Sequence, residues 1–262
     1  MIEDLDPSGN MAYILGPKLG LANEDEEEQF YVILTVVCLI STISGAVAAG
    51  FLKQFKRRPI LLVTCTLSIG GIFLASFCIN KYIYILGYVM NYFSIGCNWV
   101  VTAKFMEEVV PENMLGVCYS MTILMGWFGS VIAGFFVDVL PSAGSPEQVL
   151  LENRSYQILI CIPMVFGGIS MIALFTWVDH ESPIYYISTG QKDLALKTLS
   201  KYYYGCPELA FQELSRSTDI DKSNVTLSVA FTSPKYRRAS LIVLGTLFFL
   251  CLNGQLFIDP VA

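Results

Sequence analysis

Long runs of apolar residues alternate with short polar segments along most of this 262-residue chain. Each run contains about 20 residues, which is enough for an α-helix to cross the roughly 30 Å hydrocarbon core of a bilayer. Residues 1–30 are acidic instead, and residues 179–238 form one long polar segment. The pattern predicts an all-α integral membrane protein with six transmembrane helices, at about 31–50, 59–79, 82–101, 114–140, 156–178 and 239–258.

The composition supports a membrane protein and excludes several other classes. Hydrophobic residues make up 54% of the chain and charged residues 15%, whereas soluble domains carry about 25% charged residues. The chain has one histidine, and its eight cysteines show no C-x-x-C spacing, so neither a zinc site nor a disulfide framework is expected. No nucleophile–base pair and no basic patch is visible, so the sequence predicts no enzyme, no cofactor and no nucleic-acid partner.

A short basic hinge at residues 49–59 determines the predicted orientation. Lysine and arginine in short loops stay on the cytoplasmic side of a membrane. With the hinge inside, thirteen of the sixteen lysine and arginine residues lie in cytoplasmic segments. We therefore expect residues 1–30 to be an acidic extracellular segment and residues 179–238 to be a cytoplasmic loop. Both termini are then extracellular or lumenal, and the expected location is the plasma membrane.

The long polar segment carries signals for short helices. Ser182 is a candidate N-cap, Pro183 suits the first helical position, and Gly190 is a candidate stop. The following stretch places Ala195, Leu199, Tyr202 and Tyr203 on one face, while Lys197 and Lys201 lie off that face. The sequence therefore predicts a helical cytoplasmic loop that includes an amphipathic helix.

Some positions inside the predicted spans are not simply apolar. Ser41, Gly45 and Ala49 repeat at four-residue spacing, which lets a neighbouring helix approach closely. Polar side chains inside a span usually face a cavity or another helix. Five residues are therefore candidates either for a substrate pathway or for contacts between helices: Asn91, Asn98, Trp99, Asn253 and Gln255.

The hinge resembles a signature of the major facilitator superfamily, a family of membrane transporters. The family motif is G-x-L-A-D-R-F-G-R-R-P, and the hinge reads A-G-F-L-K-Q-F-K-R-R-P. The matching residues are Phe55, Arg57, Arg58 and Pro59, whereas Ala49, Lys53 and Lys56 replace the first Gly, the Asp and the later Gly.

Three further segments are similar to motifs of the sugar-porter and organic cation/anion branches of this superfamily. Before the fourth span, the matching residues are Phe105, Glu108, Pro111 and Gly116, with Leu115 in place of an Arg. After the fifth span they are Glu181, Ser182, Pro183 and Gly190. The segment Phe231–Leu241 resembles the entry to the seventh helix of organic cation/anion transporters.

The resemblance covers residues 31–258 and implies an incomplete major facilitator fold. The six spans would correspond to helices two to seven of a twelve-helix transporter, and the missing helices are expected in the rest of a full-length chain. The implied function is secondary transport of a small organic solute, either an organic ion or a sugar-like molecule, across the lipid bilayer by alternating access.

The resemblance also implies roles for the motif residues. In the family, the hinge Asp and an Arg early in helix four belong to a charge network that holds the outward-open state; Lys53 and Tyr88 stand there in this chain. A gating role is implied for Lys53, Lys56, Arg57, Arg58, Glu108, Pro111, Gly116, Glu181, Ser182 and Pro183. Glu108 could pair with one of the hinge bases as a clamp at the inner face, or it could be a solvated loop carboxylate. For the bases, the alternatives to gating are topology and lipid-headgroup contact.

Other positions depart from the sugar-porter pattern. Sugar porters carry glutamines in helices five and seven, where this chain has Ile123, Leu250 and Cys251. That difference favours an amphiphilic organic ion over a hexose. Together with the changed charges, it leaves open a transport-inactive membrane sensor or scaffold of the same fold, or an inactive gene fragment.

Overall fold

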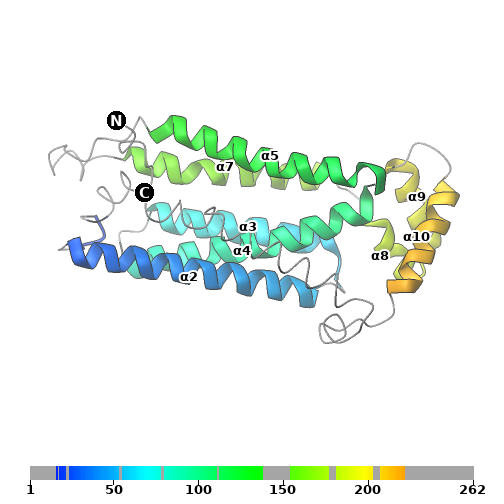
Figure 1. The fold of residues 1–262 in the computed structure, drawn as a ribbon, viewed down its shortest axis with the longest axis horizontal. Coiled ribbons are helices and arrows are strands. Elements are labelled where there is room, and N and C mark those ends of the chain that lie inside the picture. The colour runs from blue at the N-terminus through cyan, green and yellow to red at the C-terminus, as the bar shows by residue number, and fades with distance from the viewer. Residues whose placement is uncertain are drawn as a thin grey trace. The chain divides into compact units, whose positions relative to one another are not determined.

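All regular structure in the described part of the chain is helical (Figure 1). The computed structural model describes residues 16, 18–21, 24–52, 55–77, 80–110, 112–137, 154–176, 181–202 and 207–221. The chain divides into two compact units, Met1–Tyr185 and Tyr186–Ala262. The predicted all-α class is confirmed for the described residues.

The long helices of the first unit are α2 (Glu24–Phe51), α3 (Arg57–Phe77), α4 (Lys81–Val109), α5 (Glu112–Val137) and α7 (Ser155–Thr176). Within the described residues, Asp25–Phe51 and Arg57–Phe77 are long and apolar enough to cross a membrane. Met114–Gly129 and Ile160–Thr176 are shorter apolar helical stretches. The sixth predicted span, residues 239–258, lies outside the described residues, so the count of six stays a prediction.

Helix α4 is the centre of the first unit. It packs against α2 and against α3, and α3 packs in turn against α7. Glycines allow the closest of these approaches. A Cβ built on Gly71 would lie 2.5 Å from the Gly87 carbonyl oxygen, and a Cβ on Gly87 would lie 2.5 Å from the Gly71 carbonyl oxygen. Any larger residue would therefore push α3 and α4 apart.

The predicted small-residue face of α2 is confirmed as a packed face. Ser41 and Ala49 are buried, and a Cβ on Gly45 would collide with the backbone carbonyl of Phe93 on α4. Gly96 on α4 meets the backbone of Thr42 in the same way. Because small side chains leave the two backbones in contact, α2 and α4 form a tight helix pair.

Two buried clusters fill the first unit. One contains Phe30, Leu34 and Cys38 of α2 together with Ile72, Ala75, Tyr84 and Ile160 from α3, α4 and α7. The other contains Ala49, Ile60, Leu61, Cys97 and Val101, with Leu174 of α7 packed against it. Both clusters draw on α2, α3 and α4, which shows again that α4 organises the unit.

Two helix boundaries differ from the sequence prediction. Helix α2 begins at Glu24, so the acidic run before Tyr31 is helical. Asp25, Glu26 and Glu28 are exposed and Glu27 is half-buried, and the run lies where the helix dipole favours negative charge. Helix α4 continues to Val109, so Glu108 lies on a helix and not in a loop. Hydropathy reports the membrane-embedded part of a helix, whereas the hydrogen-bonded backbone continues beyond it.

Helix α5 is held much more loosely than its neighbours. It contacts α4 and α7 at only a few places. A Cβ built at Gly116 or Gly129 would meet no atom within 4 Å among the described residues. Large apolar side chains such as Trp127 and Phe128 are more than half exposed. Most of the α5 surface is therefore available to lipid or to other helices.

The short helix α8 (Pro183–Ser188) confirms its predicted signals. The backbone N–H of Tyr185 donates to Ser182 Oγ at 3.2 Å, and Pro183 is the first helical residue. Gly190 has φ +75°, the left-handed conformation that commonly ends a helix. The second unit contains α9 (Lys192–Tyr202), which buries Ala195 and Leu199 as predicted, and α10 (Pro207–Asp221), which packs against α9.

Candidate functional site

The hinge bases meet two carboxylates at one end of the first unit. Arg57 is the first residue of α3, and Glu108 lies in the last turn of α4. Arg57 Nη2 donates to Glu108 Oε1 at 2.9 Å, and the two side chains are only 13% and 9% exposed. When an ion pair is this far removed from solvent, loss of one partner leaves the other as a buried charge, and this lowers stability. The pair therefore joins the start of α3 to the end of α4.

A second carboxylate, that of Glu181, binds the start of α3. The backbone N–H of Arg58 donates to Glu181 Oε2 at 3.3 Å, and Glu181 is 7% exposed. The first N–H groups of a helix have no partner inside the helix, and the positive end of its dipole favours an anion. Glu181 thus satisfies one of these N–H groups and neutralises that end of α3.

Arg58 makes the matching contact at the end of α7. Its Nε donates to the carbonyl oxygen of Leu174 at 3.3 Å, and its guanidinium lies 6.0 Å from the ring centroid of Phe175. The last carbonyls of a helix lack internal partners and favour a cation. The Arg58 side chain therefore ties the end of α7 to the start of α3.

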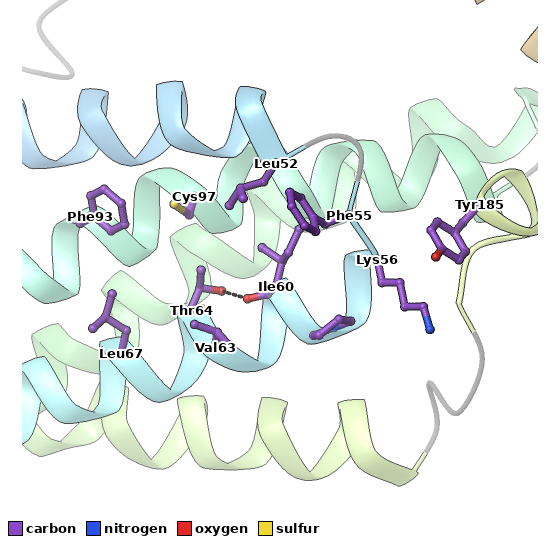
Figure 2. Close-up of a pocket in the computed structure, with 11 residues that line it drawn as sticks. Leu52, Phe55, Lys56, Ile60, Val63, Thr64, Leu67, Phe93, Cys97 and Tyr185 are labelled. Atoms are coloured by element: carbon purple, nitrogen blue, oxygen red, sulfur yellow. Dashed lines mark hydrogen bonds between the residues drawn. The ribbon is translucent and has the colours of Figure 1, made fainter. Parts of the chain in front are cut away.

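Lys56, the other hinge base in the described part of the chain, has a different environment. Lys56 is exposed, and its Nζ lies 5.7 Å above the ring centroid of Tyr185. Beside it opens a cavity of about 550 Å³, lined mainly by apolar side chains of α3 and α4 (Figure 2). Lys56 and Tyr185 lie at one end of the lining, and Leu67 and Phe93 lie at the other.

The structure brings some of the predicted site residues together and separates others. Arg57 and Glu108 form an ion pair, and the Arg58 backbone N–H donates to Glu181; we call these four residues the hinge cluster. The buried Ser182 and Pro183 lie directly after Glu181. Gly116 lies on the loosely packed α5 and Lys56 lies outside the ion pairs of the described residues. Lys53, Pro111, Asn253 and Gln255 lie outside the described residues.

The two asparagines of α4 have partners on α3. Ser68 Oγ donates to Asn91 Oδ1 at 2.6 Å, and the Thr64 hydroxyl contacts Asn98 Oδ1. This is the interhelical arrangement that the sequence left as the alternative to a substrate pathway. Trp99 is 79% exposed, so its ring does not lie with the asparagine side chains against α3.

Sequence reasoning missed a ladder of tyrosines on α4. Tyr84 is almost fully buried, and its hydroxyl donates to the Tyr88 hydroxyl at 3.0 Å. The rings of Tyr88 and Tyr92 stack with centroids 6.1 Å apart. The four-residue spacing of these tyrosines was the available signal, because residues four apart share one helix face. Among the described residues no cluster of histidine, cysteine and carboxylate side chains is arranged to hold a metal ion.

Comparisons with known proteins agree with this architecture. The chain is 23% identical over 239 residues to hexose transporter 1 of Plasmodium falciparum, covering 88% of this chain and 46% of that protein. It is 28% identical over 187 residues to the low-affinity glucose transporter HXT3 of Saccharomyces cerevisiae, covering 70% and 31%. It is 21% identical over 231 residues to solute carrier family 2, facilitated glucose transporter member 12 of Homo sapiens, covering 88% and 35%. The chain thus spans less than half the length of each of these relatives.

A solved structure gives the same result for the fold. The proton:xylose symporter of the major facilitator superfamily superposes with a TM-score of 0.68 at 14% identity, over 87% of this chain and 52% of that one. Residues 15–259 match the family model described as sugar (and other) transporter. The chain therefore belongs to the sugar (and other) transporter family, has the fold of the major facilitator symporter, and is a multi-pass integral membrane protein.

Proposed function

We propose that this chain contributes helices two to seven to a membrane transporter for a small sugar-like solute, working by alternating access. The family match over residues 15–259 supports the transporter class, and the hexose and glucose transporters among its relatives support the solute class. The proposed environment is the plasma membrane with the hinge on the cytoplasmic side. The expected partners are the solute, the lipid bilayer and the remaining helices of the fold.

The hinge cluster is the structural observation that carries the proposal. In alternating access, one helix bundle moves against another around a central site. A bundle that moves as a unit needs its helix ends held together. Arg57 with Glu108, and Arg58 with Glu181 and Leu174, connect α3 to α4, α7 and the segment before α8. We assign these residues the role of a brace within one bundle, on which gating between bundles depends.

Uptake in liposomes by the full-length transporter that contains this chain tests the proposal directly. We expect labelled D-glucose to accumulate above the level of protein-free liposomes and to be displaced by excess unlabelled glucose. Tetraethylammonium serves as the organic-ion probe, and uptake of that ion without glucose would contradict the sugar assignment. Uptake by that full-length transporter equal to that of protein-free liposomes for both probes would contradict the transport function.

A transport-inactive sensor or scaffold is the second candidate. It is favoured by the residues at motif positions, since Lys56 replaces a Gly, Tyr88 stands where the family has an Arg, and Ile123 stands where sugar porters have a Gln. Binding of glucose without uptake, measured by a shift in the thermal unfolding of the reconstituted chain, would identify this function. Sequencing the complete transcript distinguishes both candidates from an inactive gene fragment.

A further inference from the structure

The cavity beside Lys56 is an apolar groove that follows α3. Its walls include Ile60, Thr64 and Leu67, which share one face of α3, and Phe93 and Cys97 of α4 (Figure 2). Helices α2 and α3 both pack on α4, and Leu52, which directly follows α2, also belongs to the lining. From Pro59 to Leu67 the groove runs along about 12 Å of helix axis at 1.5 Å per residue. That length approaches the roughly 15 Å of one bilayer leaflet.

The polar groups of Thr64 and Cys97, inside the groove, are already engaged. The Thr64 hydroxyl donates to the Ile60 carbonyl at 3.0 Å and contacts Asn98. The Cys97 thiol donates to the Gly45 carbonyl at 3.0 Å. A sugar in the groove would lose its hydrogen bonds to water and find few replacements, which is costly. A hydrocarbon chain has no such requirement, so the lining suits an acyl chain.

The mouth of the groove carries a positive charge. Arg57 and Arg58 are held by the hinge cluster, whereas Lys56 has no carboxylate within 4.0 Å in the described part of the chain. Its long side chain is exposed and lies near the Tyr185 ring. Lysine and tyrosine both favour the boundary between hydrocarbon and headgroups. An anionic group would therefore be placed at the end of the groove where an acyl chain emerges.

We propose that the groove binds one acyl chain of an anionic phospholipid from the cytoplasmic leaflet, with the headgroup phosphate at Lys56. The proposal rests on the membrane orientation proposed above and commits to lipid as the occupant, because apolar lining and a cationic mouth match the two parts of such a molecule. The lipid would fill the space over α4 between α2 and α3, and would hold the hinge against the bundle.

Lipid retention tests the proposal without any measurement of transport. The chain is purified from nanodiscs of phosphatidylcholine mixed with phosphatidylglycerol, and the retained lipid is counted by native mass spectrometry. We expect wild type to retain phosphatidylglycerol preferentially. K56Q should lower that preference about five-fold, the contribution of one lysine near an anionic leaflet, and K56R should restore it. K104Q is the matched control, because Lys104 is exposed but pairs with Glu107 away from the groove.

A second variant tests the acyl-chain half of the proposal. Val63 lines the groove and is 67% exposed, so V63W should fill the space without disturbing the core and should remove the retained lipid. I172W, at an exposed apolar position of α7, is its control. Equal retention by wild type, K56Q and V63W would overturn the proposal, as would equal retention of the two lipids by wild type. Displacement of the lipid by soluble glycerol phosphate would also overturn it, because the site would then be polar.

Discussion

The two ends of α4 are held to their neighbours by different physical means. Near its start, Tyr84 is 2% exposed, and its ring packs 4.7 Å from the Tyr88 ring and 6.3 Å from the Phe30 ring of α2. Near its end, Glu108 is held by an ion pair with Arg57. Apolar packing tolerates small shifts of position, whereas a buried ion pair requires one geometry and both partners. The bundle is therefore packed along α4 and is aligned by charge in addition at the hinge end.

The largest loss of stability is expected from truncating the buried Tyr84 side chain near the start of α4. Tyr84→Ala removes a buried ring and should lower the free energy of unfolding by about 4 kcal/mol, the usual cost of an aromatic-to-alanine cavity. The measurement is unfolding of the purified chain in detergent, followed by tryptophan fluorescence. Tyr84→Phe is the control, because it keeps the ring and loses only the hydrogen bond to Tyr88, for about 1 kcal/mol. Equal losses for the two variants would assign the role of Tyr84 to its hydroxyl.

A somewhat smaller loss of stability is expected from breaking the ion pair between Arg57 and Glu108 near the end of α4. Glu108→Leu removes the nearly buried ion pair with Arg57 and should cost about 3 kcal/mol of unfolding free energy. The double variant R57M/E108L removes both charges and should recover most of that loss. A double-mutant cycle measures the coupling, with the exposed pair of Lys104 and Glu107 as the matched control, where about 0.5 kcal/mol is expected. If the double variant is no more stable than Glu108→Leu, the loss comes from packing and not from the broken ion pair.

The smallest effect is expected where a charge meets a helix end. Glu181→Gln keeps an oxygen that can accept from the Arg58 N–H but removes the negative charge, so we expect a loss of about 1 kcal/mol. Ser182→Ala removes the N-cap of α8 at a similar cost of about 1 kcal/mol. The two losses differ in their response to salt, because only the first includes a charge interaction. Unfolding measured at low and high ionic strength separates them, and identical salt dependence would count against the dipole argument.

The motif residues show how far sequence reasoning reached at the site. The resemblance grouped Arg57, Arg58, Glu108 and Glu181 as motif residues, and the pairing of Glu108 with a hinge base was one of two alternatives. The structure selects Arg57 as that partner. It also adds a contact that no motif indicates, the bond from Arg58 to the Leu174 carbonyl. A backbone acceptor leaves no trace in side-chain identity, so this contact was not predictable.

By itself the sequence determined the membrane class, the approximate positions of the helices and the local signals around α8. These features depend on hydropathy, spacing and capping, which act over a few turns of one segment. Only the tertiary structure decided that Asn91 and Asn98 bind α3, that Glu108 lies on a helix beside Arg57, and that a groove opens next to Lys56. Each of these features depends on which helices are neighbours and on how far one is shifted along its axis relative to the other. That registry is set by contacts such as Gly71 against Gly87, which arise only when distant segments pack together.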